Sequence, residues 1–233
     1  MRQHYGVICR LVLILYLLVL LSSSAFAASG LDLNHWTEER IMLSNLELVF
    51  QVPGGQHDAA PPRPTIRRVD LVRDFANLPP ERNGFPIYDH TWAVDARFLI
   101  GNMGSLNLIV SVARRPNDYT AEFTSLDDLQ PVIARNLDRT YTATNEKVRR
   151  QGNEKFAARL PETYNRVNIR GRAWLVYSLG GWFDRTFYAT LLTKNHYLQV
   201  GFDFINNSRG HKSDWRQQSQ EISDKIITSV EIR

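Results

Sequence analysis

Cysteine is almost absent from this chain of 233 residues, since the single one, Cys9, lies at the start of an apolar run near the N-terminus. If that run is removed with a leader, the remaining chain has no cysteine, which excludes disulfides, thiol nucleophiles and thiolate metal sites. A domain without disulfides depends on its hydrophobic core for stability. The apolar content of 43% makes such a core feasible.

Signatures of catalysis and of metal or phosphate binding are also lacking. The histidines are far apart, and none belongs to a His-Glu-x-x-His motif, so no set of metal ligands is indicated. The segment nearest to a Gly-x-Ser-x-Gly motif, Gly104-Ser105-Leu106, lacks the second glycine. No glycine-rich loop precedes an expected helix in the way that phosphate binding requires. We therefore expect no enzyme activity, no cofactor and no metal.

A strong excess of charge of one sign is missing too. The formal net charge is +4, and it falls to +2 without residues 1–27, which hold two arginines and no acid. Domains that bind nucleic acid usually carry a clear basic excess. Nucleic acid is therefore not expected as a partner.

The N-terminus has the three parts of a secretory signal peptide. Arg2 and Arg10 precede the uncharged run Leu11–Leu21, and Ala25-Phe26-Ala27 supplies the small-residue ending. We expect cleavage after Ala27 and a periplasmic or secreted location. The alternative is a membrane anchor, but the run is shorter than the roughly 20 residues that cross a bilayer. No membrane span is therefore expected after cleavage.

Hydrophobic patterning predicts a single domain over residues 46–233, after a loosely attached N-terminal segment over residues 28–45. Several segments alternate apolar and polar residues, which is the pattern of a half-buried strand. The expected strands span residues 46–52, 67–75, 91–100 and 106–112, with the last two as a hairpin, short polar strands within 146–169, and an antiparallel meander over 172–205 that turns at Gly180-Gly181 and Lys194-Asn195.

Two helices are expected beside these strands. Ser125 is suited to cap a helix whose first turn carries Asp127 and Asp128, and apolar residues follow at helical spacing. Ser213 is suited to cap a last helix that runs to about Ile227 and has one apolar face. The predicted fold class is therefore α+β, with helices packed on an antiparallel sheet.

Four segments, spread over most of the chain after the leader, carry a resemblance to a known fold. They are Phe50-Gln51-Val52-Pro53, Ser125-Leu126-Asp127-Asp128-Leu129, residues 167–174 (VNIRGRAW) and residues 226–232 (IITSVEI). In this order, they resemble the Mog1/PsbP-like fold, an α/β/α sandwich of small exported or lumenal proteins. Members of that fold mostly look like accessory or binding proteins, so the resemblance implies such a role and supplies no catalytic residues.

Basic residues gather where short strands are expected, and Arg166, Arg170 and Arg172 form the candidate group. If they share one face, they suit an anionic partner such as a carboxylate-rich protein surface or lipid headgroups. The alternative is that they are scattered solubilising charges balanced by nearby acids, which the small net charge favours.

Aromatic residues beside loops give the other candidates. Trp182 and Phe183 directly follow Gly180-Gly181, and Tyr88 and His90 border an irregular, proline-rich segment. An exposed aromatic side chain next to a loop often anchors a partner. The alternatives are core packing for Trp182 and a solvent-exposed loop position for His90.

Together these observations favour a non-enzymatic binding or accessory protein of the cell envelope that recognises a protein partner, as an assembly factor or in an immunity-type role. Two other classes stay open. A hydrolase without a recognisable motif would need a deep pocket with His90 or His196 beside a carboxylate and a serine. A small-ligand carrier would need an elongated apolar cavity. A protein-binding role is expected to appear as an exposed patch containing Trp182 or the arginines.

Overall fold

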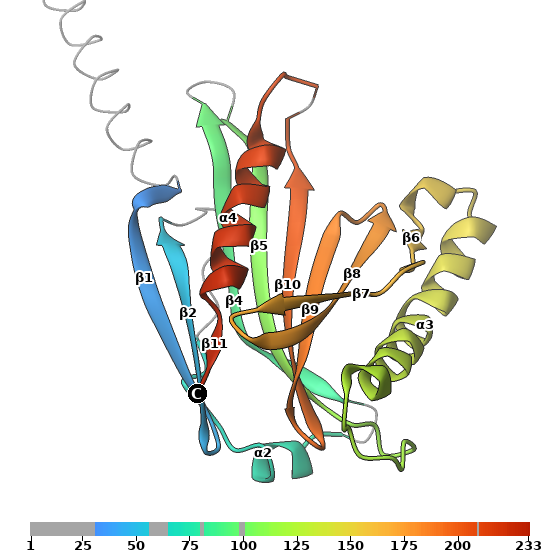
Figure 1. Ribbon diagram of the computed structural model, residues 1–233. Coiled ribbons are helices and arrows are strands. Elements are labelled where there is room, and N and C mark those ends of the chain that lie inside the picture. The colour runs from blue at the N-terminus through green and yellow to red at the C-terminus, as the bar shows by residue number, and fades with distance from the viewer. Residues whose placement is uncertain (1–30, 56–64, 80–81, 98–100, 209) are drawn as a thin grey trace, which may run out of the picture.

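The computed structural model describes residues 31–55, 65–79, 82–97, 101–208 and 210–233, so the expected signal peptide over residues 1–27 lies outside the described part. The described chain forms two β-sheets, and its two long helices pack against opposite faces of the larger sheet (Figure 1). This is the α+β class that the sequence predicts. The difference is that the strands divide into two sheets instead of one.

The larger sheet has seven strands, and each pair of neighbouring strands runs antiparallel. The predicted pairing of the hairpin and the predicted meander are both confirmed in it. The second strand of the hairpin begins earlier than expected, at Gly101, and residues 98–100 lie outside the described part. The first turn of the meander lies at residues 182–184, just after Gly180-Gly181. In spatial order the strands are β4 (Gly84–Arg97), β5 (Gly101–Arg114), β10 (His196–Asn206), β9 (Arg185–Thr193), β8 (Arg172–Gly181) and β6 (Ala158–Arg159), while β7 (Asn165–Ile169) also pairs with β8.

The smaller sheet corrects the expectation of a loosely attached segment before residue 46. Strand β1 (Asp32–Leu43) pairs with β2 (Leu46–Gly54) in continuous register from Trp36 to Leu43, and the side chains of Ile41 and Leu43 are fully buried. Patterning missed β1 because most of its N-terminal part is exposed and polar. The order of this sheet is β11 (Glu231–Ile232), β2, β1 and β3 (Arg68–Val69), and β3 runs parallel to β1.

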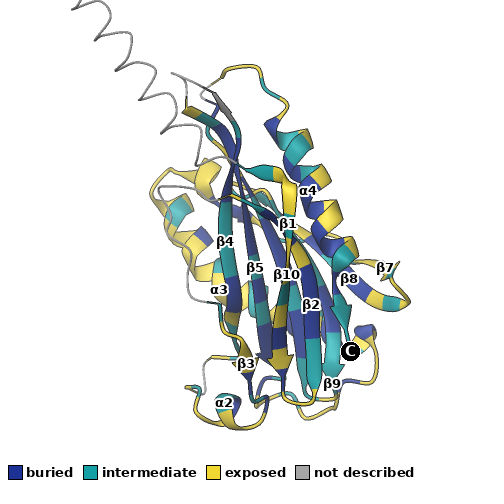
Figure 2. Ribbon diagram, turned by 90° about the vertical axis from the view of Figure 1, so that its left-hand side faces the viewer, coloured by how far each residue is buried: buried dark blue, intermediate teal, exposed yellow. Residues whose placement is uncertain are grey.

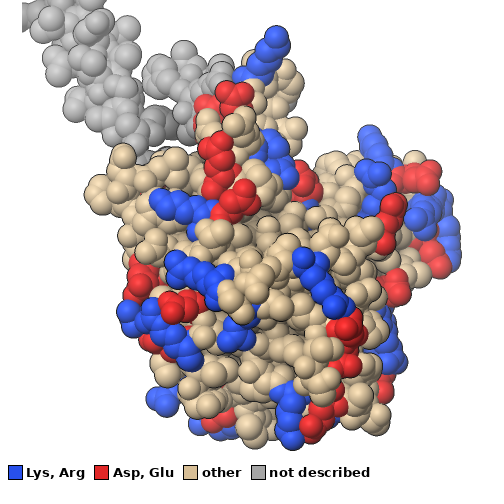
Figure 3. All heavy atoms as spheres, in the orientation of Figure 1, with Lys and Arg blue, Asp and Glu red and all other residues tan. Residues whose placement is uncertain are grey.

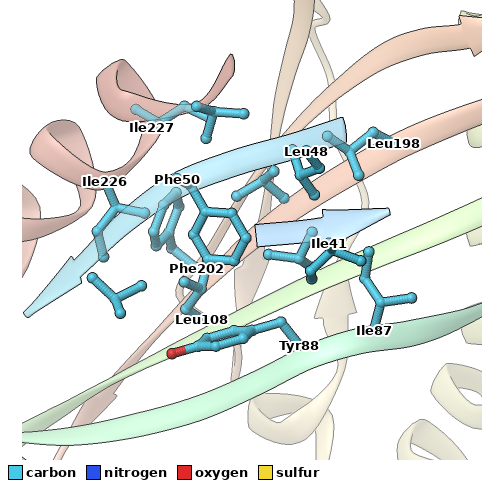
Figure 4. Close-up of a cluster of buried hydrophobic side chains, with 14 of the residues drawn as sticks. Ile41, Leu48, Phe50, Ile87, Tyr88, Leu108, Leu198, Phe202, Ile226 and Ile227 are labelled. Atoms are coloured by element: carbon cyan, nitrogen blue, oxygen red, sulfur yellow. The ribbon is translucent and has the colours of Figure 1, made fainter. Parts of the chain in front are cut away.

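Helix α4 (Trp215–Ser229) and the smaller sheet cover the same face of the larger sheet and enclose the main core. The helix turns its buried residues toward the sheets and its exposed residues outward (Figure 2). Ile226 and Ile227 of α4 lie over Phe50 of β2 and Phe202 of β10, and all four are almost completely buried (Figure 4). The apolar face that the sequence predicts for the last helix therefore covers this core.

Helix α3 (Leu126–Arg150) lies on the other face of the larger sheet. It begins with the expected cap: the Ser125 hydroxyl accepts a hydrogen bond from the Asp127 backbone N–H (3.2 Å), and the Asp128 carboxylate accepts one from the Ser125 N–H (3.0 Å). Leu129 and Ile133 pack against the sheet in a second, smaller core. Only the N-terminal half of α3 has this run of buried apolar residues.

Two segments differ from the predicted elements. Residues 67–75, expected as a strand, form the short β3 and the helix α2 (Arg73–Ala76), whose start is fixed by the Asp70 carboxylate accepting from the Val72 and Arg73 N–H groups. Residues 146–150, expected to begin a strand, are the last turn of α3. Their sequence, EKVRR, consists mostly of good helix formers, which explains the difference.

Glycine is required where β5 passes beneath α4. A Cβ atom added at Gly104 would lie 2.1 Å from the Trp215 ring, whereas one added at Gly180 would meet the Arg159 side chain at an ordinary 3.5 Å. We expect Gly104→Ala to lower the free energy of unfolding by about 1–3 kcal/mol, because the overpacked ring must move. Gly180→Ala is the matched control and should leave stability unchanged or slightly higher. Urea unfolding measures both, and a neutral Gly104→Ala would contradict the packing of α4 on β5.

Candidate functional site

The residues that the sequence singles out do not form one surface. Tyr88 is only 6% exposed and packs edge-on against Phe50, with ring centroids 5.2 Å apart. His90 is half-buried, and the centroid of its ring lies 4.5 Å from that of the Trp92 ring. Its Nε2 atom lies 3.3 Å from the Gly55 carbonyl oxygen. Burial raises the pKa of Tyr88 and lowers the pKa of His90. Tyr88 is therefore a core residue and not an exposed anchor, and His90 lies along the same core.

The three candidate arginines all lie on the β7–β8 hairpin, but they point to different partners. Arg166 forms an ion pair with Asp127 at the start of α3. Arg170 lies at the hairpin turn, 3.9 Å from the carboxylate of Glu231, and Arg172 donates to the Leu191 carbonyl oxygen (2.9 Å). Burial lowers the pKa of Arg172.

Arg170 and Arg172 both line a shallow pocket of about 490 Å³ between the hairpin turn and the C-terminal strand β11. Glu231 lines the same pocket and supplies a negative charge there. The three arginines thus do not present one shared cationic face. Two of them share a pocket with an acid, and the third is paired on the side of α3.

Trp182 and Phe183 lie in the turn between β8 and β9, at one end of the molecule. Trp182 is 61% exposed, and its ring meets the Phe156 ring edge-on at 4.5 Å. Phe156 belongs to the 3₁₀ turn η1 (Glu154–Phe156), and we call Phe156, Trp182 and the residues of these two turns the aromatic tip. Phe183 is half-buried: its ring lies 5.8 Å from Tyr141 of α3 and carries the Arg185 guanidinium 4.4 Å above it.

A groove of about 430 Å³ lies between the middle of α3 and the larger sheet. The C-terminal half of α3 is held at β6, the outermost strand of this sheet. The Asn145 side chain donates to the Ala158 carbonyl oxygen and accepts from the Ala158 N–H, both at 2.8 Å, and both residues are buried. In Figure 1 this part of α3 lies beside β6, at the outer end of the sheet. We call the space the α3 groove.

Aromatic and amide side chains line the α3 groove. Tyr177 of β8 stacks on Phe187 of β9, with ring centroids 5.2 Å apart and planes 18° apart. Tyr197 of β10 is hydrogen-bonded to Asn136 of α3, and burial raises the pKa of its hydroxyl to about 12, so this group is neutral at physiological pH. The other residues of the groove are Asn83, Gly84, Phe85, Pro86, Ser111, Ala113, Ile133, Leu137, Arg139, Thr140, Tyr141 and Gln199.

Sequence reasoning missed the α3 groove because its lining comes from six separate elements: α3, β4, β5, β8, β9 and β10. One signal was present in the meander: Tyr177 and Phe187 lie on the face opposite to buried Trp174 and Phe202, so these strands are apolar on both faces. A second signal was Tyr141, which continues the apolar stripe of α3 four residues after Leu137.

The histidines that a hydrolase would need have contacts of their own. His196 lies 3.0 Å from the Thr193 hydroxyl through its Nδ1 atom and 4.9 Å from the Phe75 ring, and burial lowers its pKa. Within the described ranges, no three His, Asp or Glu side chains are grouped so that they could hold a metal ion. Over the same residues, no helix combines the length and apolar character that crossing a bilayer requires.

Comparisons with known proteins bear on the fold. No protein-family model matches the chain, and no curated protein matches it in sequence. Among solved structures, it is similar to the solution structure of cyanobacterial PsbP (CyanoP) from Synechocystis sp. PCC 6803, with 14% sequence identity and a TM-score of 0.38. The match covers 84% of this chain and 93% of that one. PsbP is the group that the sequence segments resemble.

The β7–β8 turn offers a test of why Arg170 stands where it does. Arg170 and Gly171 have φ angles of 51° and 80°, the arrangement of a type I′ turn, in which asparagine is favoured at the first position. We expect Arg170→Asn to raise the free energy of unfolding by up to about 1 kcal/mol, because left-handed backbone is costly for most side chains. Chemical denaturation measures the change.

Arg166→Asn is the control for this prediction, since Arg166 lies in the extended strand β7 and gains no such relief. A stabilised Arg170→Asn variant beside an unimproved Arg166→Asn variant is the expected pair of results. Loss of stability in Arg170→Asn would mean that the contact with Glu231 outweighs the strain of the turn.

Proposed function

We propose that this chain is a non-enzymatic binding protein of the cell envelope that recognises a protein partner, as an assembly factor or in an immunity-type role. A segment of that partner lies in the α3 groove. The expected leader, with cleavage after Ala27, supports the location. The observation that carries the proposal is the aromatic and amide lining of a groove that is open to solvent.

The composition of the α3 groove supports a protein as the occupant. Tyrosine, phenylalanine and arginine are enriched at the centres of protein interfaces, and Tyr141, Phe187 and Arg139 line this groove together. Gln199 and Ser111 add polar groups suited to hydrogen bonds with the backbone of a bound segment. A carrier of apolar ligands would instead be expected to enclose a dry cavity.

The geometry of the groove supports a preformed site. Its helical wall is fixed by the capping box at Ser125 and by the paired hydrogen bonds between Asn145 and Ala158. On the sheet side, Tyr177 is buried and Phe187 is half-buried. A partner segment therefore meets a rigid surface and loses little affinity to ordering of this chain.

Two threonines of α3 allow a matched test of the groove. Thr140 lines the groove, whereas Thr142 is exposed two residues further along the helix, about 200° around its axis, and is not part of the lining. Thr140→Arg places a long charged side chain in the groove, and Thr142→Arg makes the same change of charge and size outside it. The full chain and both variants are used to capture proteins from an envelope extract.

We expect a protein that wild type and Thr142→Arg retain and that Thr140→Arg loses. Titration calorimetry with that purified protein should then show at least a tenfold weaker affinity for Thr140→Arg, which corresponds to about 1.4 kcal/mol. Equal affinity of the two variants would exclude the α3 groove as the site. Capture of no protein, together with turnover of a generic ester or peptide substrate, would reject the binding function in favour of a hydrolase.

A further inference from the structure

The aromatic tip exposes large apolar side chains at an end of the molecule. Trp182 is 61% exposed and Phe156 is 37% exposed, and their rings support each other in edge-to-face contact. The Lys155 ammonium lies 5.1 Å from the centre of the Phe156 ring. The main core and the smaller core both lie elsewhere, so these rings are not exposed parts of a core.

Basic residues surround the aromatic tip. Residues 146–159, which run from the last turn of α3 through η1 and β6, hold five basic and two acidic side chains and thus a formal charge of +3. Figure 3 shows these charged side chains gathered at the upper right, over the end of α3 and η1. The five basic residues, all exposed, are Lys147, Arg149, Arg150, Lys155 and Arg159.

Three backbone N–H groups at the aromatic tip are hydrogen-bonded to nearby carbonyl oxygens. The N–H groups of Phe156 and Ala157 donate to the carbonyl oxygens of Asn153 and Glu154, both at 2.9 Å, and the Trp182 N–H donates to the Ala157 carbonyl oxygen at 3.4 Å. Pairing of β6 with β8 joins the two turns. These paired N–H groups lower the cost of moving the tip out of water, because an unpaired peptide group is expensive to desolvate.

We propose that the aromatic tip docks on an anionic lipid surface. Trp182 and Phe156 enter the headgroup region, where aromatic rings with a polar neighbour are favoured, and Lys155 and Arg159 remain at the level of the lipid phosphates. The basic excess selects anionic lipids, since five basic residues stand against the acids Glu146, Glu154 and Asp184, and basic residues close to such a surface each add to the attraction. This site adjoins the α3 groove, since the Phe183 ring lies 5.8 Å from the Tyr141 ring, but it does not depend on the function proposed for the groove.

Shape favours a lipid surface over a protein as the partner of this tip. The end of α3, β6 and the β8–β9 turn lie at the outer right of the molecule in Figure 1, and the side chains of Trp182 and Phe156 in this region are 61% and 37% exposed. Protein interfaces usually place their aromatic anchors in well-packed central pockets. A lipid headgroup layer accepts a projecting ring without a complementary pocket.

The test uses fluorescent labels at two ends of the full chain. Cys9→Ser removes the native thiol, and a single cysteine is then introduced either by Asn153→Cys, in the aromatic tip, or by Val72→Cys, beside α2. Asn153 is exposed and its side chain makes no cap hydrogen bond, while Val72 is 77% exposed. Each labelled chain is mixed with vesicles of phosphatidylcholine alone or of phosphatidylcholine with phosphatidylglycerol.

We expect the label at residue 153 to shift to the blue, and to be quenched by brominated lipids, only with the anionic vesicles. The label at residue 72 should not respond, whatever the N-terminal region does. Trp182→Ser should abolish the response at residue 153. The double variant Lys155→Glu, Arg159→Glu should weaken it about tenfold or more, whereas the control Arg68→Glu, Arg73→Glu near α2 should leave it unchanged.

Three results would overturn the proposal. The label at residue 153 could fail to respond to anionic vesicles, or both labels could respond equally, which would mean that the tip has no special contact with lipid. Alternatively, the label at residue 153 could respond only to a captured protein. In that case the aromatic tip is a protein interface.

Discussion

The structure depends on the burial of one face of the seven-stranded sheet beneath helix α4 and the smaller sheet. Ile226 and Ile227 lie over Phe50 and Phe202, so the last helix and an N-terminal strand meet on the same central strands. Each such side chain contributes about 1.5–3 kcal/mol when fully buried. Strand β11 pairs with β2 and thereby holds the end of the chain to this core.

The opposite face of the sheet is covered only in part, and this is where the proposed functions lie. Helix α3 packs through Leu129 and Ile133, but beyond its middle it is tied to β6 through the paired hydrogen bonds of Asn145 and Ala158. The α3 groove is the space left between helix and sheet. The aromatic tip lies next to these hydrogen bonds, where α3 ends and β6 pairs with β8. The paired hydrogen bonds between Asn145 and Ala158 therefore help to position both candidate surfaces.

The sequence predicts those parts of the fold that follow from local rules. The hairpin and the meander show in alternation because their strands have a buried face, and the start of α3 shows in the capping residues around Ser125. For Trp182 the sequence leaves exposure and core packing open, and the structure places it in a turn with 61% of its surface exposed. Tyr88 is misassigned because Pro86 suggests a loop, whereas β4 is an edge strand, which tolerates proline. The α3 groove escapes prediction because it depends on where the helix lies over Tyr177 and Phe187.

The central claim is that the smaller sheet, α4 and the central strands of the larger sheet form one cooperative core. Native-state hydrogen exchange in low concentrations of denaturant tests it most directly. The account predicts that the slowest amides of β2, β5, β10 and α4 exchange with the same free energy of opening, equal to that of global unfolding. If β1 and β2 open with a clearly lower free energy while β5 and β10 stay protected, the smaller sheet is an appendage and the account is contradicted.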